Sequence, residues 1–134
     1  MTAFFDTNIL VYAFANDEPK RRIAQQSLVL GGLISAQVLN EFTNVLRKKQ
    51  ALDWPQIEAA LGVVERWFET VSPLTRETHR MAVDLARDHV ISFYDALIVA
   101  AAIEADCDSL YSEDLQNGRR FGDCVVVNPF AAAS

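Results

Sequence analysis

The chain opens with Met1-Thr-Ala-Phe-Phe-Asp-Thr-Asn8, a short apolar run that stops at an acid. Residues 3–5 are expected to form a buried β-strand, which leaves Asp6 at the carboxyl end of that strand. In an open α/β sheet, the carboxyl ends of the strands border the crevice in which ligands bind. The opening therefore predicts a functional edge, provided that other polar side chains reach it. Asp6 also fits a simpler role as the cap of a helix beginning at Thr7, because Asp favours that position.

Length and composition narrow the classes of protein to be considered. The 134 residues suit a single domain, 1–134, and 51% of them are hydrophobic, so a packed core is expected. The net charge of -6 argues against broad, nonspecific binding of nucleic acid, which depends on neutralising phosphates with Lys and Arg. It leaves room for a small site whose acids are neutralised by bound cations. The basic clusters, which also fit solvated helix faces, are 20–22, 47–49 and 119–120.

The cysteines and the apolar runs bear on the compartment. Cys107 and Cys124 have neither the number nor the spacing of a zinc site, and fit buried apolar groups in a reducing compartment. No basic segment precedes Phe4, so no signal peptide is expected. The longest apolar run, 96–103, is too short to cross a bilayer. We therefore expect a cytoplasmic protein that is not embedded in a membrane.

Strand-like and helix-like segments alternate along the chain. This alternation predicts an α/β fold, in which a mostly parallel central sheet is covered by helices on both faces. The predicted strands cover 3–5, 33–35, 70–73, 109–112 and 124–127. The predicted helices cover about 9–14, 19–30, 36–49, 53–69, 74–89 and 92–103.

Three further acids are expected at the same edge of the sheet as Asp6. Glu41 lies at the border of the apolar stripe of its predicted helix, and Asp95 lies in the first turn of a helix that is apolar all round. Asp114 closely follows the predicted strand 109–112. Strand ends and the starts of the following helices meet at one edge of a parallel sheet. Each acid alone also fits a simpler role, as a helix cap or an ordinary surface charge.

Four carboxylates in one pocket would repel one another strongly. Two unit charges about 4 Å apart cost ~4 kcal/mol at an effective dielectric constant of 20. The cluster must therefore be partly protonated or hold divalent cations. Oxygen ligands without nearby His or Cys favour one or two Mg²⁺ or Mn²⁺ ions over zinc, and such ions support phosphodiester hydrolysis. Asn8 and Ser112, two neutral polar groups at the same edge, could position water or substrate, or simply close turns.

Five segments, which together cover nearly the whole chain, resemble the PIN-domain ribonucleases and in particular the VapC toxins of bacterial toxin–antitoxin pairs. The first segment alone would be weak, but all five in this order form a strong signal. They are Phe5-Asp-Thr-Asn-Ile-Leu10, Ser35-Ala-Gln-Val-Leu-Asn-Glu-Phe42, Tyr94-Asp-Ala-Leu-Ile-Val-Ala-Ala-Ala102, Tyr111-Ser-Glu-Asp114 and Val127-Asn-Pro-Phe130.

The resemblance implies a PIN-like three-layer α/β/α sandwich with an acidic catalytic site that binds metal. It implies that Asp6, Glu41, Asp95 and Asp114 form this site. It also implies endonucleolytic cleavage of RNA that depends on Mg²⁺ or Mn²⁺, a homodimer, and inhibition by a small antitoxin protein bound across the site. Glu113 stands beside Asp114 and leaves open which of the two is the fourth acid.

Three other interpretations of the acids stay open. A phosphoacceptor receiver domain also has an acidic Mg²⁺ pocket, but it normally has adjacent acids after the first strand and a Lys after the last. The chain has Thr7 and Asn8 after Asp6, and no Lys in 125–130. A phosphatase of the haloacid-dehalogenase type would need Asp at position 8. The third alternative is a PIN fold that has lost catalysis and serves only as a binding partner.

Overall fold

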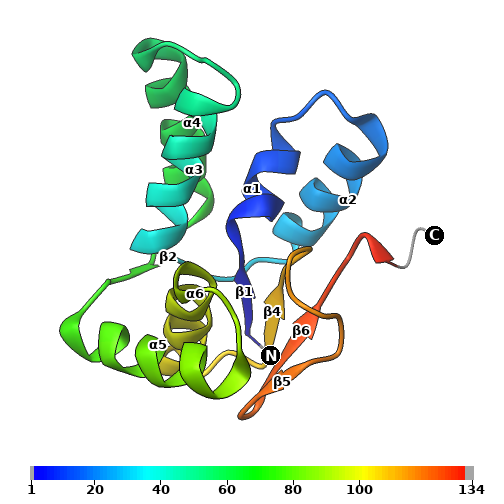
Figure 1. Ribbon diagram of the computed structural model, residues 1–134. Coiled ribbons are helices and arrows are strands. Elements are labelled where there is room, and N and C mark those ends of the chain that lie inside the picture. The colour runs from blue at the N-terminus through cyan, green and yellow to red at the C-terminus, as the bar shows by residue number, and fades with distance from the viewer. Residues whose placement is uncertain (1, 132–134) are drawn as a thin grey trace.

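Strand β1 (Ala3–Phe5) pairs in parallel with β4 (Ser109–Tyr111), although about a hundred residues separate them along the chain (Figure 1). In this computed structural model, which describes residues 2–131, β4 also pairs in parallel with β6 (Cys124–Val127). The short β5 (Arg120–Phe121) runs antiparallel to β6 at the edge of the sheet, so the strand order is β1-β4-β6-β5. The central strands are strongly apolar because helices and loops bury them.

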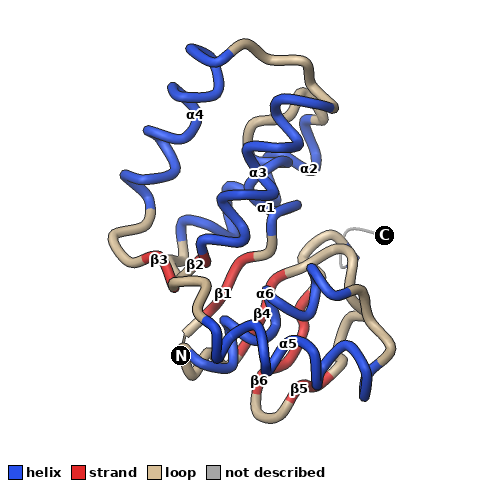
Figure 2. Tube along the Cα trace, turned by 60° about the vertical axis from the view of Figure 1, so that its left-hand side comes forward, coloured by secondary structure: helices blue, strands red, loops and turns tan. Residues whose placement is uncertain are grey.

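A second, two-stranded parallel sheet continues this array beyond β1. It consists of β2 (Ile34–Ser35) and β3 (Val71–Ser72). Leu33 links the two sheets, because its carbonyl accepts from the Phe5 N–H at 3.0 Å and its own N–H donates to the Ala3 carbonyl at 2.9 Å. Figure 2 shows β2 and β3 at one end of the strand array and β5 at the other.

Each helix in the described part of the chain begins at a side-chain cap, formed by Asp, Ser or Thr. Helix α6 is buried through most of its length and contacts β2 and β4, while α5 packs along α6. Helices α1 to α4 stand beyond the carboxyl end of β1 (Figure 1). The helices are α1 (Thr7–Ala13), α2 (Glu18–Val29), α3 (Ala36–Lys48), α4 (Trp54–Trp67), α5 (Arg76–His89) and α6 (Phe93–Glu104).

The predicted α/β class with a mostly parallel central sheet is confirmed, with differences in detail. The predicted strand 70–73 exists as β3, but it pairs with β2 outside the main sheet. Strand β5 was not predicted, since a two-residue strand after a turn has no apolar alternation to reveal it. Helix ends differ by up to two residues; α1, for example, begins at Thr7 rather than at residue 9. Of the predicted domain, 1–134, residues 1 and 132–134 lie outside the described residues.

The two cysteines are buried and unpaired, as predicted. Burial raises the pKa of the Cys107 thiol to about 11 and also raises the pKa of Cys124. Among the helices that the structure describes, none combines the length and the apolar character needed to span a bilayer.

Candidate active site

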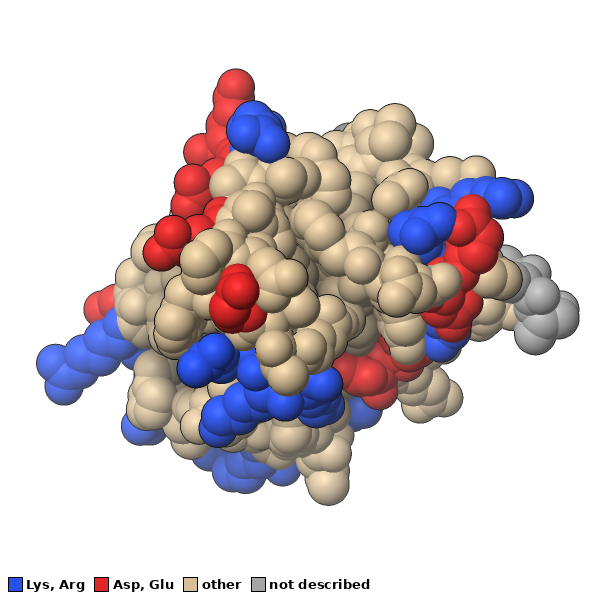
Figure 3. All heavy atoms as spheres, turned by 90° about the horizontal axis from the view of Figure 1, so that it is seen from above, with Lys and Arg blue, Asp and Glu red and all other residues tan. Residues whose placement is uncertain are grey.

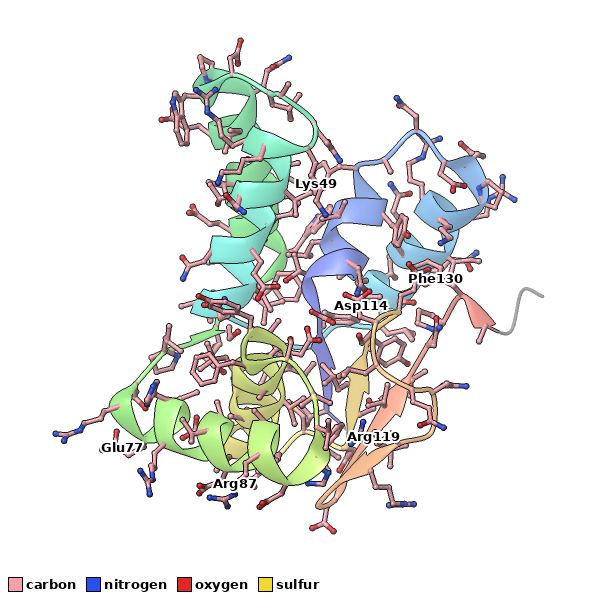
Figure 4. The ribbon with its side chains drawn as sticks, in the orientation of Figure 1. Lys49, Glu77, Arg87, Asp114, Arg119 and Phe130 are labelled. Carbon is pink, nitrogen blue, oxygen red and sulfur yellow. The ribbon has the colours of Figure 1, made fainter. Side chains whose placement is uncertain are left out.

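Three of the predicted acids lie together at the carboxyl end of β1 and β4. Asp6 ends β1, Asp95 lies in the first turn of α6, and Asp114 follows β4. One carboxylate oxygen from each lies within 4.8 Å of the other two. Figure 4 shows Asp114 beyond the end of β4, on the side where α1 leaves β1. We call Asp6, Asp95 and Asp114 the carboxylate triad.

The Asp6 carboxylate is the buried member of the triad, with only 3% of its surface exposed. Its Oδ1 accepts from the backbone N–H of Thr7 at 2.6 Å, which makes Asp6 the cap of α1. Its Oδ2 accepts from the Ser112 hydroxyl at 2.6 Å and from the Asn8 side-chain amide at 3.4 Å. Capping and membership of the triad are therefore compatible, because the carboxylate carries enough lone pairs for both.

Burial and like charge raise the pKa of two triad members. Burial is the main reason why the pKa of Asp6 rises from 3.8 to about 7; the hydrogen bonds from Ser112 and Thr7 oppose the rise, and the charges of Asp95 and Asp114 add to it. Burial also raises the pKa of Asp95, the hydrogen bond that its carboxylate accepts from Ser92 opposes the rise, and the Asp114 charge adds to it. Near neutral pH, the triad therefore favours uptake of a proton or of a cation.

Glu41 lies outside the 4.8 Å group among the described residues. Its Oε1 accepts from the Thr7 hydroxyl at 2.9 Å, and its Oε2 accepts from the Gln37 amide at 3.0 Å. Since the Thr7 N–H binds Asp6, Glu41 is linked to the triad through Thr7. Of the four acids expected in one pocket, the structure brings three together. Glu41 lies at the border of this group, where it lines a hollow together with Asp95.

Ser112 and Asn8 join the parts of the site that come from opposite ends of the chain. The Ser112 hydroxyl is fully buried, donates to Asp6, and accepts from the backbone N–H groups of Asp114 at 3.2 Å and Leu115 at 3.4 Å. The Asn8 side-chain oxygen accepts from the Glu113 N–H at 3.2 Å. Both residues therefore hold the segment after β4 against the start of α1.

Glu113 points to a different place from its neighbour Asp114. Its carboxylate accepts from Lys20 Nζ and from the Tyr12 hydroxyl, each at 2.6 Å. Burial acts to raise the pKa of Glu113, but these two hydrogen bonds and the Lys20 charge outweigh it, so the pKa is lowered. Tyr12 packs edge-on against Phe130, at 4.9 Å between ring centroids, and Lys20 lies over both rings. Asp114, rather than Glu113, therefore joins the triad.

Lys20 and Tyr12 were not predicted as neighbours of the site. Lys20 belongs to the basic cluster 20–22, but the sequence carries no signal that one member of this cluster turns inward to Glu113. Tyr12 lies in the first helix, where its hydroxyl faces Glu113 across a separation of 101 residues. A contact between such distant segments depends on the folded topology.

The other basic clusters lie away from the triad. Lys49 and Arg119 are both well separated from Asp114 in Figure 4. Arg119 donates to the His89 carbonyl at 2.5 Å and lies over the Phe121 ring. On the face seen in Figure 3, Lys and Arg lie in several separate groups, the broadest in the lower half of the view. Within residues 2–131, no salt bridge reaches a member of the triad.

Comparisons with known proteins agree on the fold. The family model described as "PIN domain" matches residues 3–119. A toxin–antitoxin complex from Klebsiella pneumoniae contains a chain that is 23% identical, with a TM-score of 0.73; the match covers 96% of this chain and 98% of that one. No curated protein matches the sequence significantly.

Two further solved structures are similar over most of their length. VapC20 of Mycobacterium tuberculosis, described as a toxin that cleaves the sarcin–ricin loop, is 18% identical with a TM-score of 0.70, over 84% of this chain and 90% of that chain. VapBC2 of Rickettsia felis, solved with a DNA fragment from its promoter, contains a chain that is 20% identical with a TM-score of 0.69, over 94% and 97% of the two chains. At these identities, the likeness shows a shared fold.

Proposed function

This chain belongs to the PIN-domain family, and from that premise we propose that it is a metal-dependent endoribonuclease that hydrolyses phosphodiester bonds in RNA. The observation that carries the proposal is the carboxylate triad, whose oxygens lie within 4.8 Å of one another with no Lys or Arg paired to them in the described residues. Such crowding of acids is costly unless a proton or a cation neutralises it.

The triad suits a hard divalent cation. Its donors are all carboxylate oxygens, and the two cysteines line a separate hollow with Asp106, Asp108 and Asp123. Oxygen donors of this kind select Mg²⁺ or Mn²⁺. We propose that Asp6, Asp95 and Asp114 hold one or two such ions, and that Glu41 assists from the border of the site. When bound, the ion would activate water and offset the charge that develops on the phosphate.

The residues around the triad have positioning roles in this proposal. Thr7 and Ser112 each fix one oxygen of Asp6, so its remaining lone pairs have a defined direction. Ser112 also holds the backbone of Asp114 through its N–H. Asn8 connects Asp6 to the Glu113 backbone, and thereby helps to hold the loop after β4 at the site. We propose that Asn8 and Ser112 act on the carboxylates in this way, and reach substrate or water only through them.

We further propose that the chain is the toxin of a toxin–antitoxin pair. Support comes from the solved neighbours, of which one is a toxin–antitoxin complex, one is a VapBC complex and one is an RNA-cleaving VapC toxin. In this role the chain would act in the cytoplasm as a homodimer, as a single domain of 1–134, with RNA as substrate and a cognate antitoxin protein as inhibitor. The PIN family match removes the receiver-domain and phosphatase alternatives.

One alternative within the family is a PIN domain that binds a partner without catalysis. A cleavage assay distinguishes the ribonuclease from this non-catalytic binding domain. The purified chain is incubated with end-labelled single-stranded RNA, first with Mn²⁺ or Mg²⁺ and then after EDTA has removed the ion. We expect cleavage that requires the ion and is lost in Asp95→Asn. Asp123→Asn, which removes an exposed acid outside the triad, is the matched control. Cleavage that persists in EDTA, or that is equal in both variants, would reject the proposed site.

A further inference from the structure

A hollow of about 450 Å³ opens beside the triad, between α3 and the first turn of α6. This volume is within the range of ~300–1,000 Å³ that is typical of small-ligand clefts. Asp95 belongs to both the triad and the wall of the hollow, so the hollow borders the triad. We call it the amide hollow; its lining residues are Gln37, Asn40, Glu41, Asn44, Tyr94 and Asp95.

Three side-chain amides face the hollow from α3. At about 100° per residue, Gln37, Asn40 and Asn44 fall within roughly 60°, about one sixth of the helix circumference. Gln37 is committed to Glu41, to which it donates at 3.0 Å. Asn40 and Asn44 are exposed, and within residues 2–131 no side-chain hydrogen bond engages either amide. Two amides, each with a donor and an acceptor, are therefore free to bind a ligand.

Tyr94 supplies an exposed aromatic ring next to Asp95. Its relative exposure is 63%, although large aromatic residues usually pack away from water. Within the described residues, the Tyr94 ring contacts one other ring, that of Phe93, at 5.8 Å between centroids and 66° between planes. Exposed aromatic rings of this kind stack with the unpaired bases of single-stranded nucleic acids.

The charges around the amide hollow indicate which part of a nucleotide would enter it. Glu41 and Asp95 are acids, and neither Lys nor Arg lines the hollow. A phosphate would be repelled there, whereas an uncharged base would not. A carboxylate at the wall can accept from an exocyclic amino group, as carboxylates do from cytosine. The hollow therefore suits a nucleobase that carries an amino group better than it suits uracil.

We propose that the amide hollow binds an unpaired nucleobase of the RNA substrate, adjacent to the phosphate that is cleaved at the triad. Tyr94 stacks on the base, while Asn40 and Asn44 form hydrogen bonds with its edge. The proposal rests on the proposed ribonuclease function and adds a determinant of sequence preference to it. Cleavage is then expected within single-stranded segments, because pairing would hide the base edge and its face.

The test compares cleavage of a randomised single-stranded RNA pool by five variants. Tyr94→Ala is expected to lower kcat/KM about tenfold or more through KM, whereas Tyr94→Phe keeps the ring and stays within about twofold. Asn40→Ala and Asn44→Ala are expected to flatten the base preference at one position beside the cut, where uracil is disfavoured by the parent chain. Gln26→Ala, an exposed amide on α2, is the control and should leave rate and preference unchanged.

Two results would overturn the proposal. If the parent chain cleaves RNA but the Tyr94 and Asn variants keep its kcat/KM and base preference, the amide hollow is not a base site and the ribonuclease proposal stands. If the parent chain cleaves no RNA, the proposed function fails. In that case base binding is tested separately by titrating the chain with a single-stranded oligonucleotide. The NMR signals of the Asn40 and Asn44 side-chain amides are followed, and unchanged signals would mean that the amide hollow binds no base.

Discussion

Asp6 and Asp114 contribute to the same carboxylate triad, but their surroundings are opposite. Asp6 is buried and has two hydrogen bonds of 2.6 Å to its carboxylate. Asp114 is exposed. Its backbone N–H donates to Ser112, but within the described residues no hydrogen bond or salt bridge reaches its carboxylate. One side of the site is therefore fixed before any ligand arrives, and the other is free to adjust. If the proposed function holds, we expect ions and substrate to reach the triad from the exposed Asp114 side.

The largest expected effect concerns activity and tests whether both sides are needed. Asp6→Asn and Asp114→Asn should each lower metal-dependent RNA cleavage by about 10²–10³-fold, because each removes a negative ligand worth several kcal/mol in the transition state. Initial rates at saturating Mn²⁺ measure this loss. Full activity in Asp114→Asn, with loss only in Asp6→Asn, would reduce the site to its buried half.

The next effect is on stability and separates the buried acid from the exposed one. Because the pKa of Asp6 is raised from 3.8 to about 7, the folded chain holds a proton that the unfolded chain releases. Without metal, the stability that this proton contributes is fully present below about pH 3.8 and is lost as the pH rises through about 7. Between pH 5 and 8 we expect a loss of roughly 2–3 kcal/mol.

Urea unfolding in EDTA at several pH values measures this loss, with Asp6→Asn and Asp114→Asn compared in parallel. Asp6→Asn should show a much smaller decrease toward pH 8 and be at least as stable as the parent there, while Asp114→Asn should follow the parent. Added Mg²⁺ should recover much of the loss in the parent by neutralising the triad. An equal pH dependence in all three chains would mean that burial of Asp6 does not govern the site.

A smaller effect is expected where the two halves are joined. Ser112→Ala removes the hydroxyl that donates to Asp6 and accepts from the N–H groups of Asp114 and Leu115. Loss of these buried partners should cost about 1–3 kcal/mol in unfolding experiments. The Mn²⁺ concentration for half-maximal cleavage should also rise, since Asp6 and Asp114 would no longer be held together. Ser112→Thr, which keeps the hydroxyl, tests whether the hydroxyl itself matters.

The smallest effect concerns the contact that turns Glu113 away from the triad. Lys20→Met should cost about 1 kcal/mol or less, because the Lys20–Glu113 pair is partly solvated, with 34% of the Lys20 side chain and 27% of the Glu113 side chain exposed. The required Mn²⁺ concentration should shift a few-fold as Glu113 competes for the cation. Arg22→Met is the control from the same basic cluster, since its pair with Glu18 is exposed. Equal behaviour of the two variants would show that Lys20 has no special role.

Much of the fold followed from local patterns in the sequence. The buried strand at 3–5 and the apolar helix that begins near Ser92 were predicted to within one residue, because each has a local signal. Helix capping, one of the two roles considered for Asp6, is present in the structure. The separate pairing of β3 with β2 was not predicted, since two-residue strands reveal no partner. The exposed surface around Tyr94 was also missed, because an aromatic residue near an apolar run resembles core.

For the site, the order of the predicted elements along the chain indicated which acids lie near strand ends or helix starts. Three of the four acids named there come together in the structure. The sequence by itself placed Asp6 and Asp114 at one edge, because in a parallel sheet the end of a strand specifies the edge reached by the next residues. It also placed Glu41 and Asp95 there, as residues near helix starts, and did not show that Glu41 stays outside the triad. It could not separate Glu113 from Asp114, since adjacent residues differ only in the direction of their side chains. Only the tertiary structure decided that difference, through the contacts of Lys20 and Tyr12 with Glu113 from segments about a hundred residues away.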